Sequence, residues 1–245
     1  MKPLICNLKM EHNLQDILKY KKELENCIGS FSLVVCPPFC YLPVMHSRYY
    51  KIGAQDVSPY GNGSYTGKIS AETLKSLDVY GVLIGHSEIE ESFENKLKKL
   101  RRVVSEGMYA YVLISDTKEE HDYQYTYVKL MGKIRAYLSR VLPKDYKNIT
   151  FIYEPFWLIG GNNAIDSKEI ANLFYQIKKE LQYEYRFNFP LFYGGGISSS
   201  NIKELYENDV IDGLLLGGFC KRAKNVVNFL QSDEFSTRLD TSIHN

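Results

Sequence analysis

The chain has 245 residues, of which 44% are hydrophobic and 13% aromatic, a composition typical of a packed globular domain and not of a disordered chain. Its 30 basic and 29 acidic side chains nearly cancel, which argues against nucleic acid as the main partner. No apolar run approaches the roughly 18–20 residues of a membrane-spanning helix, so we expect no membrane partner.

The sequence predicts a regular alternation of β-strands and α-helices. The expected strands are Leu4–Leu8, Leu33–Cys36, Lys51–Gln55, Gly81–Ile84, Ala110–Ile114, Ile149–Tyr153, Leu191–Tyr193 and Gly213–Leu216. Helical periodicity lies between them, for example over Leu14–Leu24, Phe93–Val104, Tyr123–Leu142 and Glu169–Tyr185. Strands that are apolar throughout and alternate with helices predict a parallel sheet that is covered by helices.

Eight such units of roughly 30 residues match a closed (β/α)8 barrel, a fold of typically ~250 residues. The rival architecture is an open doubly wound sheet, which carries a glycine-rich turn after its first strand. Here the first strand leads into Asn7-Leu8-Lys9-Met10, without a glycine. We therefore predict an α/β protein with one (β/α)8 barrel domain over residues 1–245.

The five cysteines are irregularly spaced, and Cys36 and Cys40 lack a second Cys or His pair at zinc spacing, so we predict no metal site. The N-terminal residues Met1–Leu4 enter the first strand without the shape of a signal peptide. A reduced, cytoplasmic protein is the simplest expectation.

Polar side chains follow several of the strands, and in a barrel these strand ends gather at one face. The first strand ends with Asn7 and Lys9, whose spacing of two residues places both side chains on the same side. Alone, Lys9 would be an ordinary surface lysine. At the mouth of a barrel it can bind an anionic substrate as a point charge.

The fourth strand runs into Gly85-His86-Ser87-Glu88. We expect His86 at the start of the following helical stretch, where the helix dipole disfavours a positive charge. A neutral imidazole could then donate a hydrogen bond and polarise a carbonyl group. The alternative is a hydrogen-bonded structural histidine.

The sixth strand ends in Glu154, which is followed by Pro155-Phe156-Trp157-Leu158-Ile159-Gly160-Gly161. A carboxylate at the C-terminal end of a strand, ahead of a loop with glycine at its far end, is typical of a catalytic base beneath a closing lid. The alternative is a helix N-cap or a salt-bridged carboxylate.

Glycines follow the last two strands, as Gly194-Gly195-Gly196 and as Gly217-Gly218. Successive glycines let backbone N–H groups approach a phosphate, and (β/α)8 barrels commonly bind phosphate after these two strands. Each glycine run alone would also fit a tight turn.

Taken together, these motifs resemble those of the triosephosphate isomerase family along essentially the whole chain. The matching segments are Asn7-x-Lys9, Ala54-Gln55-Asp56-Val57, Thr66-Gly67, Ile84-Gly85-His86-Ser87-Glu88, Tyr153-Glu154-Pro155-x-Trp157-x-Ile159-Gly160, Tyr193-Gly194-Gly195 and Gly217-Gly218. The resemblance implies an isomerase that needs no cofactor, binds a small phosphorylated sugar and forms a homodimer.

The resemblance also implies roles for single residues. Glu154 would move a proton between neighbouring carbons while a neutral His86 polarises the carbonyl, a pairing for which this family is the standard example. Lys9 would stabilise negative charge, Asn7 would add a hydrogen bond, and Glu88 would be a buried supporting carboxylate. The phosphate would be held by Gly160, Gly196, Gly217 and Gly218. The lid would include Pro155, Phe156, Trp157, Gly161 and Asn162, and the loop around Thr66 would reach into the partner subunit's site.

The chain departs from the family pattern at positions that bear on function. Gly196 stands where a serine is usual, and Gly-Gly-Asn-Asn at residues 160–163 replaces the usual Gly-Thr-Gly-Lys at the lid's C-terminal hinge. Ile89 and Glu90 replace two arginines after Glu88, so that this carboxylate needs another cation, such as Lys9.

The leading hypothesis is the family's own reaction, the interconversion of dihydroxyacetone phosphate and D-glyceraldehyde 3-phosphate through an enediolate, in glycolysis and gluconeogenesis. One alternative is an isomerase of a larger phosphorylated ketose, such as a tetrulose phosphate, which Gly196 and the altered lid keep open. Another is a catalytically silent phosphosugar-binding protein. The intact set of Asn7, Lys9, His86 and Glu154 argues against it, because a pure binder gains little from a base and an electrophile.

Overall fold

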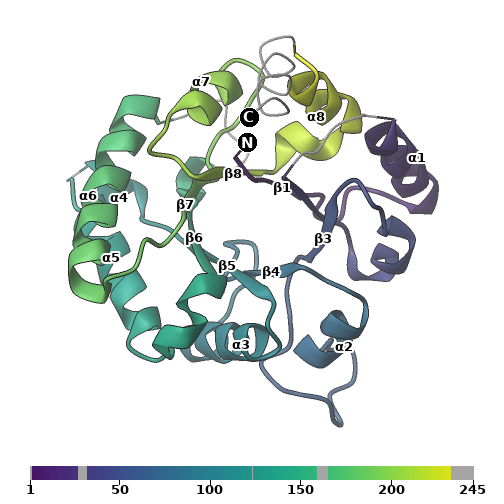
Figure 1. Ribbon diagram of the computed structural model, residues 1–245, viewed down its shortest axis with the longest axis horizontal. Helices are drawn as coiled ribbons and strands as arrows, with labels where there is room; N and C mark the ends of the chain where they lie inside the picture. The colour runs from purple at the N-terminus through teal and green to yellow at the C-terminus, as the bar shows by residue number, and fades with distance from the viewer. Residues whose placement is uncertain (1, 27–31, 123, 159–164, 233–245) are drawn as a thin grey trace, which may run out of the picture.

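The computed structural model describes residues 2–26, 32–122, 124–158 and 165–232, and its strands close into a barrel (Figure 1). The strands are β1 Leu4–Asn7, β2 Leu33–Cys36, β3 Lys51–Ala54, β4 Gly81–Ile84, β5 Tyr109–Ile114, β6 Ile149–Tyr153, β7 Leu191–Tyr193 and β8 Gly213–Leu216. Each strand pairs in parallel with its neighbours in chain order, and β8 returns to β1 in the register Leu4↔Leu214. The predicted (β/α)8 barrel is confirmed.

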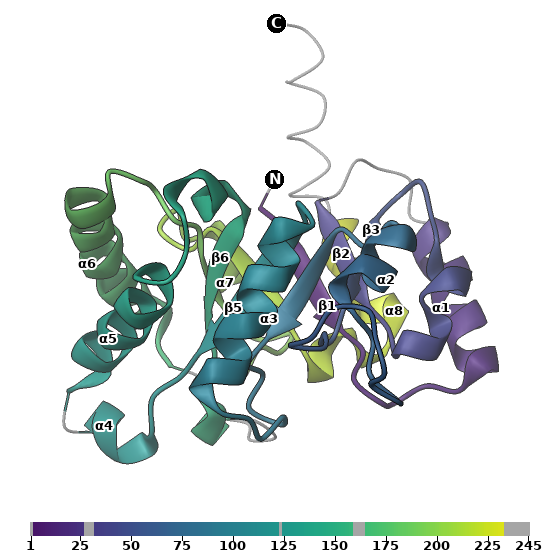
Figure 2. The same ribbon diagram turned by 90° about the horizontal axis from the view of Figure 1, so that it is seen from below.

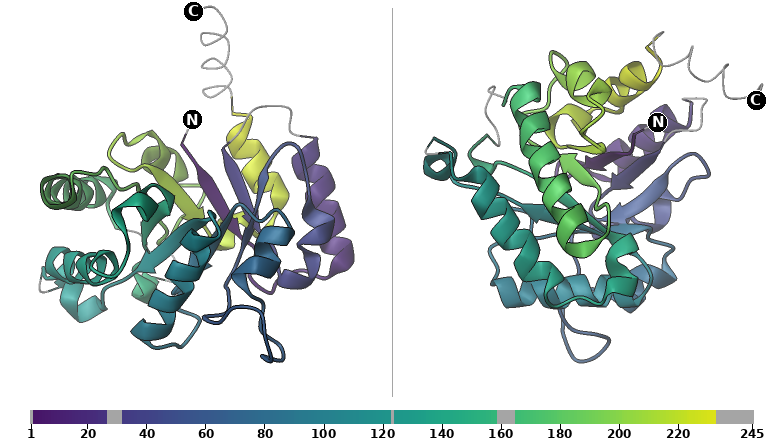
Figure 3. Two further views of the ribbon diagram at one scale, coloured as in Figure 1. Left: turned by 60° about the horizontal axis from the view of Figure 1, so that its bottom comes forward. Right: turned by 60° about the vertical axis from the view of Figure 1, so that its left-hand side comes forward.

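Eight α-helices within the described ranges surround the strands (Figures 1 and 2). They are α1 Leu14–Glu25, α2 Ala71–Ser76, α3 Phe93–Ser105, α4 Lys118–Asp122, α5 Thr126–Leu138, α6 Ser167–Tyr185, α7 Ile202–Glu207 and α8 Ala223–Leu230. Short 3-10 helices lie at Phe39–Tyr41, Pro43–Met45, Pro143–Asn148, Phe156–Leu158 and Gly218–Lys221. Views from two further sides show the helices outside the strands (Figure 3), where their apolar faces and the strands share one large buried cluster.

The interior of the barrel is filled by side chains from the strands. A second buried cluster consists of Ile5, Val34, Cys36, Leu83, Tyr111, Leu113, Ile152, Phe192 and Leu215. Glycines make room for its two largest rings: a Cβ at Gly81 would lie 2.5 Å from Cε2 of Tyr111, and a Cβ at Gly213 would lie 2.6 Å from the ring of Phe192. The interior is a packed core and not a channel, so open space for a ligand lies at the ends of the strands.

The strand predictions agree with the structure to within one residue at each end, and three of the four predicted helices agree to within two residues. The helix predicted over Tyr123–Leu142 is too long at both ends: the range contains the shorter α5, Thr126–Leu138. Gln124, between α4 and α5, has φ +61°, a left-handed conformation that an α-helix does not contain. Helix α5 ends at Leu138, ahead of Pro143.

We predict that Gly81→Ala lowers the free energy of unfolding by about 1–3 kcal/mol, because the added methyl group would overpack the barrel interior. Besides Tyr111, it would lie 2.9 Å from the carbonyl oxygen of Tyr109. The matched control is Gly132→Ala in α5, where an added Cβ has no neighbour within 4 Å. This variant should gain about 0.4–1 kcal/mol. Urea denaturation measures both changes, and equal changes in the two variants would contradict the packing account.

Candidate active site

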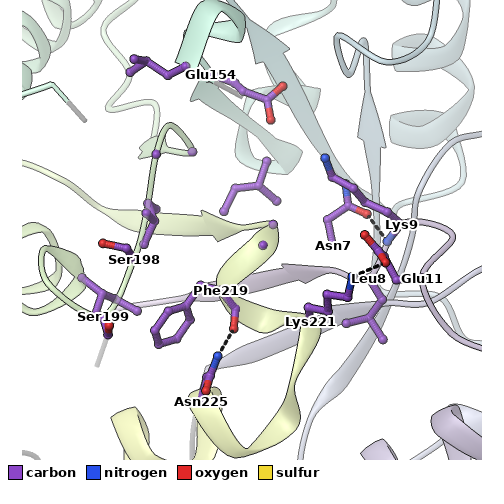
Figure 4. A pocket seen from close by; sticks show the side chains of 18 of the residues that line it. Asn7, Leu8, Lys9, Glu11, Glu154, Ser198, Ser199, Phe219, Lys221 and Asn225 are labelled. Carbon is purple, nitrogen blue, oxygen red and sulfur yellow. Dashed lines mark hydrogen bonds and ion pairs between the residues drawn. The ribbon is translucent and has the colours of Figure 1, made fainter. Parts of the chain in front are cut away.

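A cavity of about 1070 Å³ opens at the C-terminal ends of the strands. It is lined by Asn7, Leu8, Lys9, Glu11, His86, Glu88, Glu154, Leu158, Gly194, Gly196, Ile197, Ser198, Ser199, Ser200, Ile202, Leu215, Gly217, Gly218, Phe219, Lys221, Asn225, Asn228 and Phe229. In Figure 4 the Glu154 carboxylate points toward the side of the cavity that carries Asn7 and Lys9, while Ser198 and Ser199 lie on the other side. The structure therefore brings together side chains from the ends of β1, β4 and β6.

Glu154 follows β6 directly, and only 7% of its side chain is exposed. Its Oε1 lies 3.4 Å from Nε2 of His86, and the hydroxyl of Ser87 donates a hydrogen bond to its Oε2 at 3.4 Å. Burial raises the pKa of Glu154 from the ordinary 4.5 to about 7, although the charge of Lys9 and the Ser87 hydrogen bond oppose the rise. A carboxyl group with this pKa can both accept and return a proton at neutral pH.

His86 lies two residues beyond the end of β4, after Gly85, whose φ of +80° lets the chain turn there. The backbone N–H of Glu88 donates a hydrogen bond to Nδ1 of His86 at 3.2 Å. In a neutral imidazole an accepting Nδ1 leaves the proton on Nε2, the nitrogen that faces Glu154. The ring is therefore oriented to donate a hydrogen bond into the cavity.

Burial lowers the pKa of His86; the charge of Glu88 opposes this shift and the charge of Lys9 adds to it. The expectation that His86 begins a helix is wrong, because α3 begins only at Phe93. The neutral form is favoured by loss of water and not by a helix dipole.

Lys9 is held by a backbone hydrogen bond to Asn7 and by an ion pair with Glu88. The N–H of Lys9 donates to Oδ1 of Asn7 at 3.1 Å, and Lys9 has φ +50°, a left-handed conformation that costs an L-residue about 1–2 kcal/mol. Its Nζ pairs with Oε1 of Glu88 at 2.5 Å. The expectation of a buried Glu88 is wrong, since 51% of this side chain is exposed, and its cation is Lys9.

Gly196, Gly217 and Gly218 line the cavity at the ends of β7 and β8. Gly196 has φ +57°, and its carbonyl oxygen accepts a hydrogen bond from Asn201 at 2.9 Å. A Cβ at Gly218 would have no neighbour within 4 Å, and one at Gly217 would meet only Cε of Lys9 at 3.8 Å. The backbone at Gly217 and Gly218 is thus open to a ligand.

The loop after Glu154 begins with Pro155, Phe156 and Trp157, which are anchored to the end of β5. The N–H of Phe156 donates to the hydroxyl of Ser115 at 3.1 Å, and Nε1 of Trp157 donates to Oδ1 of Asp116 at 3.2 Å. The other predicted residues of this segment, Gly160, Gly161 and Asn162, lie outside the described residues.

Asp116 supports the site, and no role is predicted for it from the sequence. It is 1% exposed, and it also accepts hydrogen bonds from the hydroxyl groups of Tyr153 at 3.1 Å and Thr126 at 2.6 Å. One carboxylate thus fixes the segment that follows Glu154 to β6 and α5. Its position just beyond β5, at the same end of the barrel as Glu154, is the feature by which the sequence could have identified it.

Thr66 does not line the cavity. It lies in the exposed loop between β3 and α2, which extends away from the barrel (Figure 1). The rings of Tyr60 and Tyr65 stack in the same loop, with centroids 4.5 Å apart. Thr66 is therefore not placed to contact a ligand in the cavity of its own chain.

Within the described ranges, no group of three or more His, Cys, Asp or Glu side chains could hold a metal ion. In the same part of the chain, no helix is both long and apolar enough to cross a membrane. The cavity instead offers a carboxyl base, a neutral imidazole donor and an ammonium group. Such a set can take a proton from a carbon next to a carbonyl and stabilise the negative charge that forms.

We predict that Glu154→Gln is more stable than the wild type by about 3 kcal/mol at pH 8. Folding raises the pKa of Glu154, so the stability contributed by its protonated form is complete below pH 4.5 and is lost as the pH rises to about 7. The glutamine cannot ionise, so the difference should shrink toward zero near pH 4.5. Urea denaturation at a series of pH values measures it, and a difference independent of pH would refute the coupling of this ionisation to folding.

Comparison with known proteins places the chain in a family. A family model described as triosephosphate isomerase matches residues 2–233. The chain is 30% identical to a triosephosphate isomerase from Alkaliphilus metalliredigens, over 93% of this chain and 99% of that protein. It is also 30% identical to one from Malacoplasma penetrans, over 94% and 98%, and 28% identical to one from Natranaerobius thermophilus, over 86% and 88%. The chain belongs to the triosephosphate isomerase family.

Proposed function

We propose that the protein interconverts dihydroxyacetone phosphate and D-glyceraldehyde 3-phosphate. The observation that carries the proposal is the contact of Glu154 Oε1 with His86 Nε2 at 3.4 Å, between two buried groups whose pKa values move in opposite directions. Burial leaves Glu154 able to accept a proton and His86 able to donate a hydrogen bond at the same pH. Aldose–ketose isomerisation needs both functions at once.

In this reaction the ionised Glu154 removes a proton from the hydroxymethyl carbon next to the carbonyl, and the electron pair moves to the carbonyl oxygen. Nε2–H of His86 donates to that oxygen and stabilises the enediolate. The proton then moves between the two enediolate oxygens through His86, and Glu154 returns its own proton to the neighbouring carbon. Atoms balance without a cofactor.

Lys9 and Asn7 face the same space, and we assign them to the negative charge of the substrate and of the enediolate. The phosphate would be bound by backbone N–H groups at Gly160, Gly196, Gly217 and Gly218. The lid that includes Pro155, Phe156, Trp157, Gly161 and Asn162 would exclude water during the reaction. Glu88 would act as the counter-ion of Lys9.

We further propose a homodimer in which the loop around Thr66 approaches the partner subunit's site. The support is the exposed position of that loop, outside its own cavity. A cytoplasmic enzyme of glycolysis and gluconeogenesis follows from the proposed reaction.

A second candidate substrate is a larger phosphorylated ketose, such as a tetrulose phosphate. The cavity of about 1070 Å³ favours it, since the space continues past the glycines to Ser199, Asn225 and Asn228. Gly196 adds to that space, because it lacks the side chain that the family usually carries there.

A coupled assay with triose phosphates and tetrulose phosphates tests the choice between the two substrates, and we predict faster turnover of the triose phosphates.

We also predict that Glu154→Asp loses ~10²-fold or more in kcat, because withdrawing the carboxylate by about 1 Å misplaces the base. The matched control is Glu94→Asp on the exposed first turn of α3, which should leave kcat unchanged.

A kcat/KM about 10³-fold higher for the larger sugar would favour the second candidate. Phosphosugar binding without any turnover would instead indicate a silent binding protein. An unchanged kcat in Glu154→Asp would refute the assignment of the base.

A further inference from the structure

The side chain of Gln55, just beyond β3, connects the ends of two other strands. Its Nε2 donates one hydrogen bond to the carbonyl oxygen of Lys9 and one to the carbonyl oxygen of Cys36, each at 2.9 Å. Cys36 is the last residue of β2. Both hydrogens of the amide are thereby used, so the ends of β1, β2 and β3 are held together by one side chain.

The bond to Lys9 matters because of the backbone conformation at that residue. Lys9 has φ +50°, which side-chain-bearing residues adopt only when their surroundings impose it. Its N–H is held by Oδ1 of Asn7 at 3.1 Å, and its carbonyl oxygen is held by Gln55. The peptide groups on both sides of Lys9 are therefore fixed.

The fixed backbone determines where the ammonium group can reach. A lysine side chain is a flexible four-carbon stem, so the direction in which it leaves the backbone limits the position of its charge. Here Nζ reaches Glu88 at 2.5 Å, and the side chain lines the cavity that Glu154 and His86 also line. Gln55 is not among the residues that line this cavity, so it can act only through its neighbours.

We infer that Gln55 is a positioning residue for the reaction: it holds Lys9 in the left-handed conformation that delivers its ammonium group to the substrate. The inference rests on the charge-stabilising role proposed above for Lys9. It also predicts that an amide is needed at this position. A glutamate would turn lone pairs toward two carbonyl oxygens, and a methionine would supply no donor.

The principal test is a double-mutant cycle. Gln55→Met should lower kcat/KM by about 10–10²-fold, as expected for a charged group displaced by about 1 Å. The loss should vanish when Lys9 has already been replaced in Lys9→Met, and it should persist in full in His86→Asn. A purely structural role would give the same factor in both backgrounds, and this result would overturn the inference.

The control variant is Asp56→Asn. Asp56 is the next residue of the same loop and pairs with Nζ of Lys99 at 2.7 Å, so its substitution perturbs the loop without removing a contact to Lys9. We expect kcat/KM within about twofold of the wild type for this variant. A loss as large as that of Gln55→Met would show that the loop as a whole, and not the amide, is responsible.

A crystal structure of Gln55→Met gives a readout that does not depend on activity. Lys9 should leave the left-handed region, and its Nζ should move beyond about 4 Å from Glu88. Unchanged Lys9 geometry would overturn the inference even if the wild type isomerises triose phosphates. A wild-type protein that is inactive on every phosphosugar would refute the proposed function. The effect of Gln55→Met on the geometry of Lys9 would still be tested by the crystal structure in that case. If Gln55→Met does not fold, Gln55→Glu serves for both measurements.

Discussion

The exclusion of water from Glu154 and His86 is the constraint on which the site depends. Burial acts on the charged form of each group, so it raises the pKa of the carboxyl and lowers the pKa of the imidazole. In water the two groups would both be charged between pH 4.5 and 6.5, whereas burial favours the uncharged form of each, 3.4 Å apart. Their opposite pKa shifts follow from one physical cause.

The barrel keeps this arrangement in place. The interior below the site is packed, with glycines where large rings need room, so the strand ends that carry Asn7, His86 and Glu154 cannot shift independently. Hydrogen bonds across neighbouring loops add the local precision. Gln55 ties β3 to β1 and β2, and Asp116 ties the segment that follows Glu154 to β6 and α5.

Much of the fold and of the candidate site could be predicted from the sequence, for physical reasons. Apolar strands that end in polar or glycine residues define both the barrel and the face at which chemistry gathers, which is why Asn7, Lys9, His86 and Glu154 could be named in advance. Contacts between chain-distant loops leave no periodic signal. The exposure of Glu88 and the bridging contacts of Gln55 therefore required the structure, whereas Lys9 was already a candidate partner of Glu88. The neutral state of His86 was anticipated for the wrong reason, because α3 begins at Phe93, seven residues beyond His86, and its dipole does not act on the imidazole.

We propose that Glu154, whose pKa is raised by burial, is the base, and a single measurement tests this directly. The measurement is the pH dependence of kcat/KM for isomerisation of glyceraldehyde 3-phosphate by the wild-type protein, which reports ionisations of the free enzyme. We predict that kcat/KM falls with a slope of one on the acid side, with an apparent pKa of about 7. An acid limb near 4.5, the ordinary value for this side chain, would contradict the account.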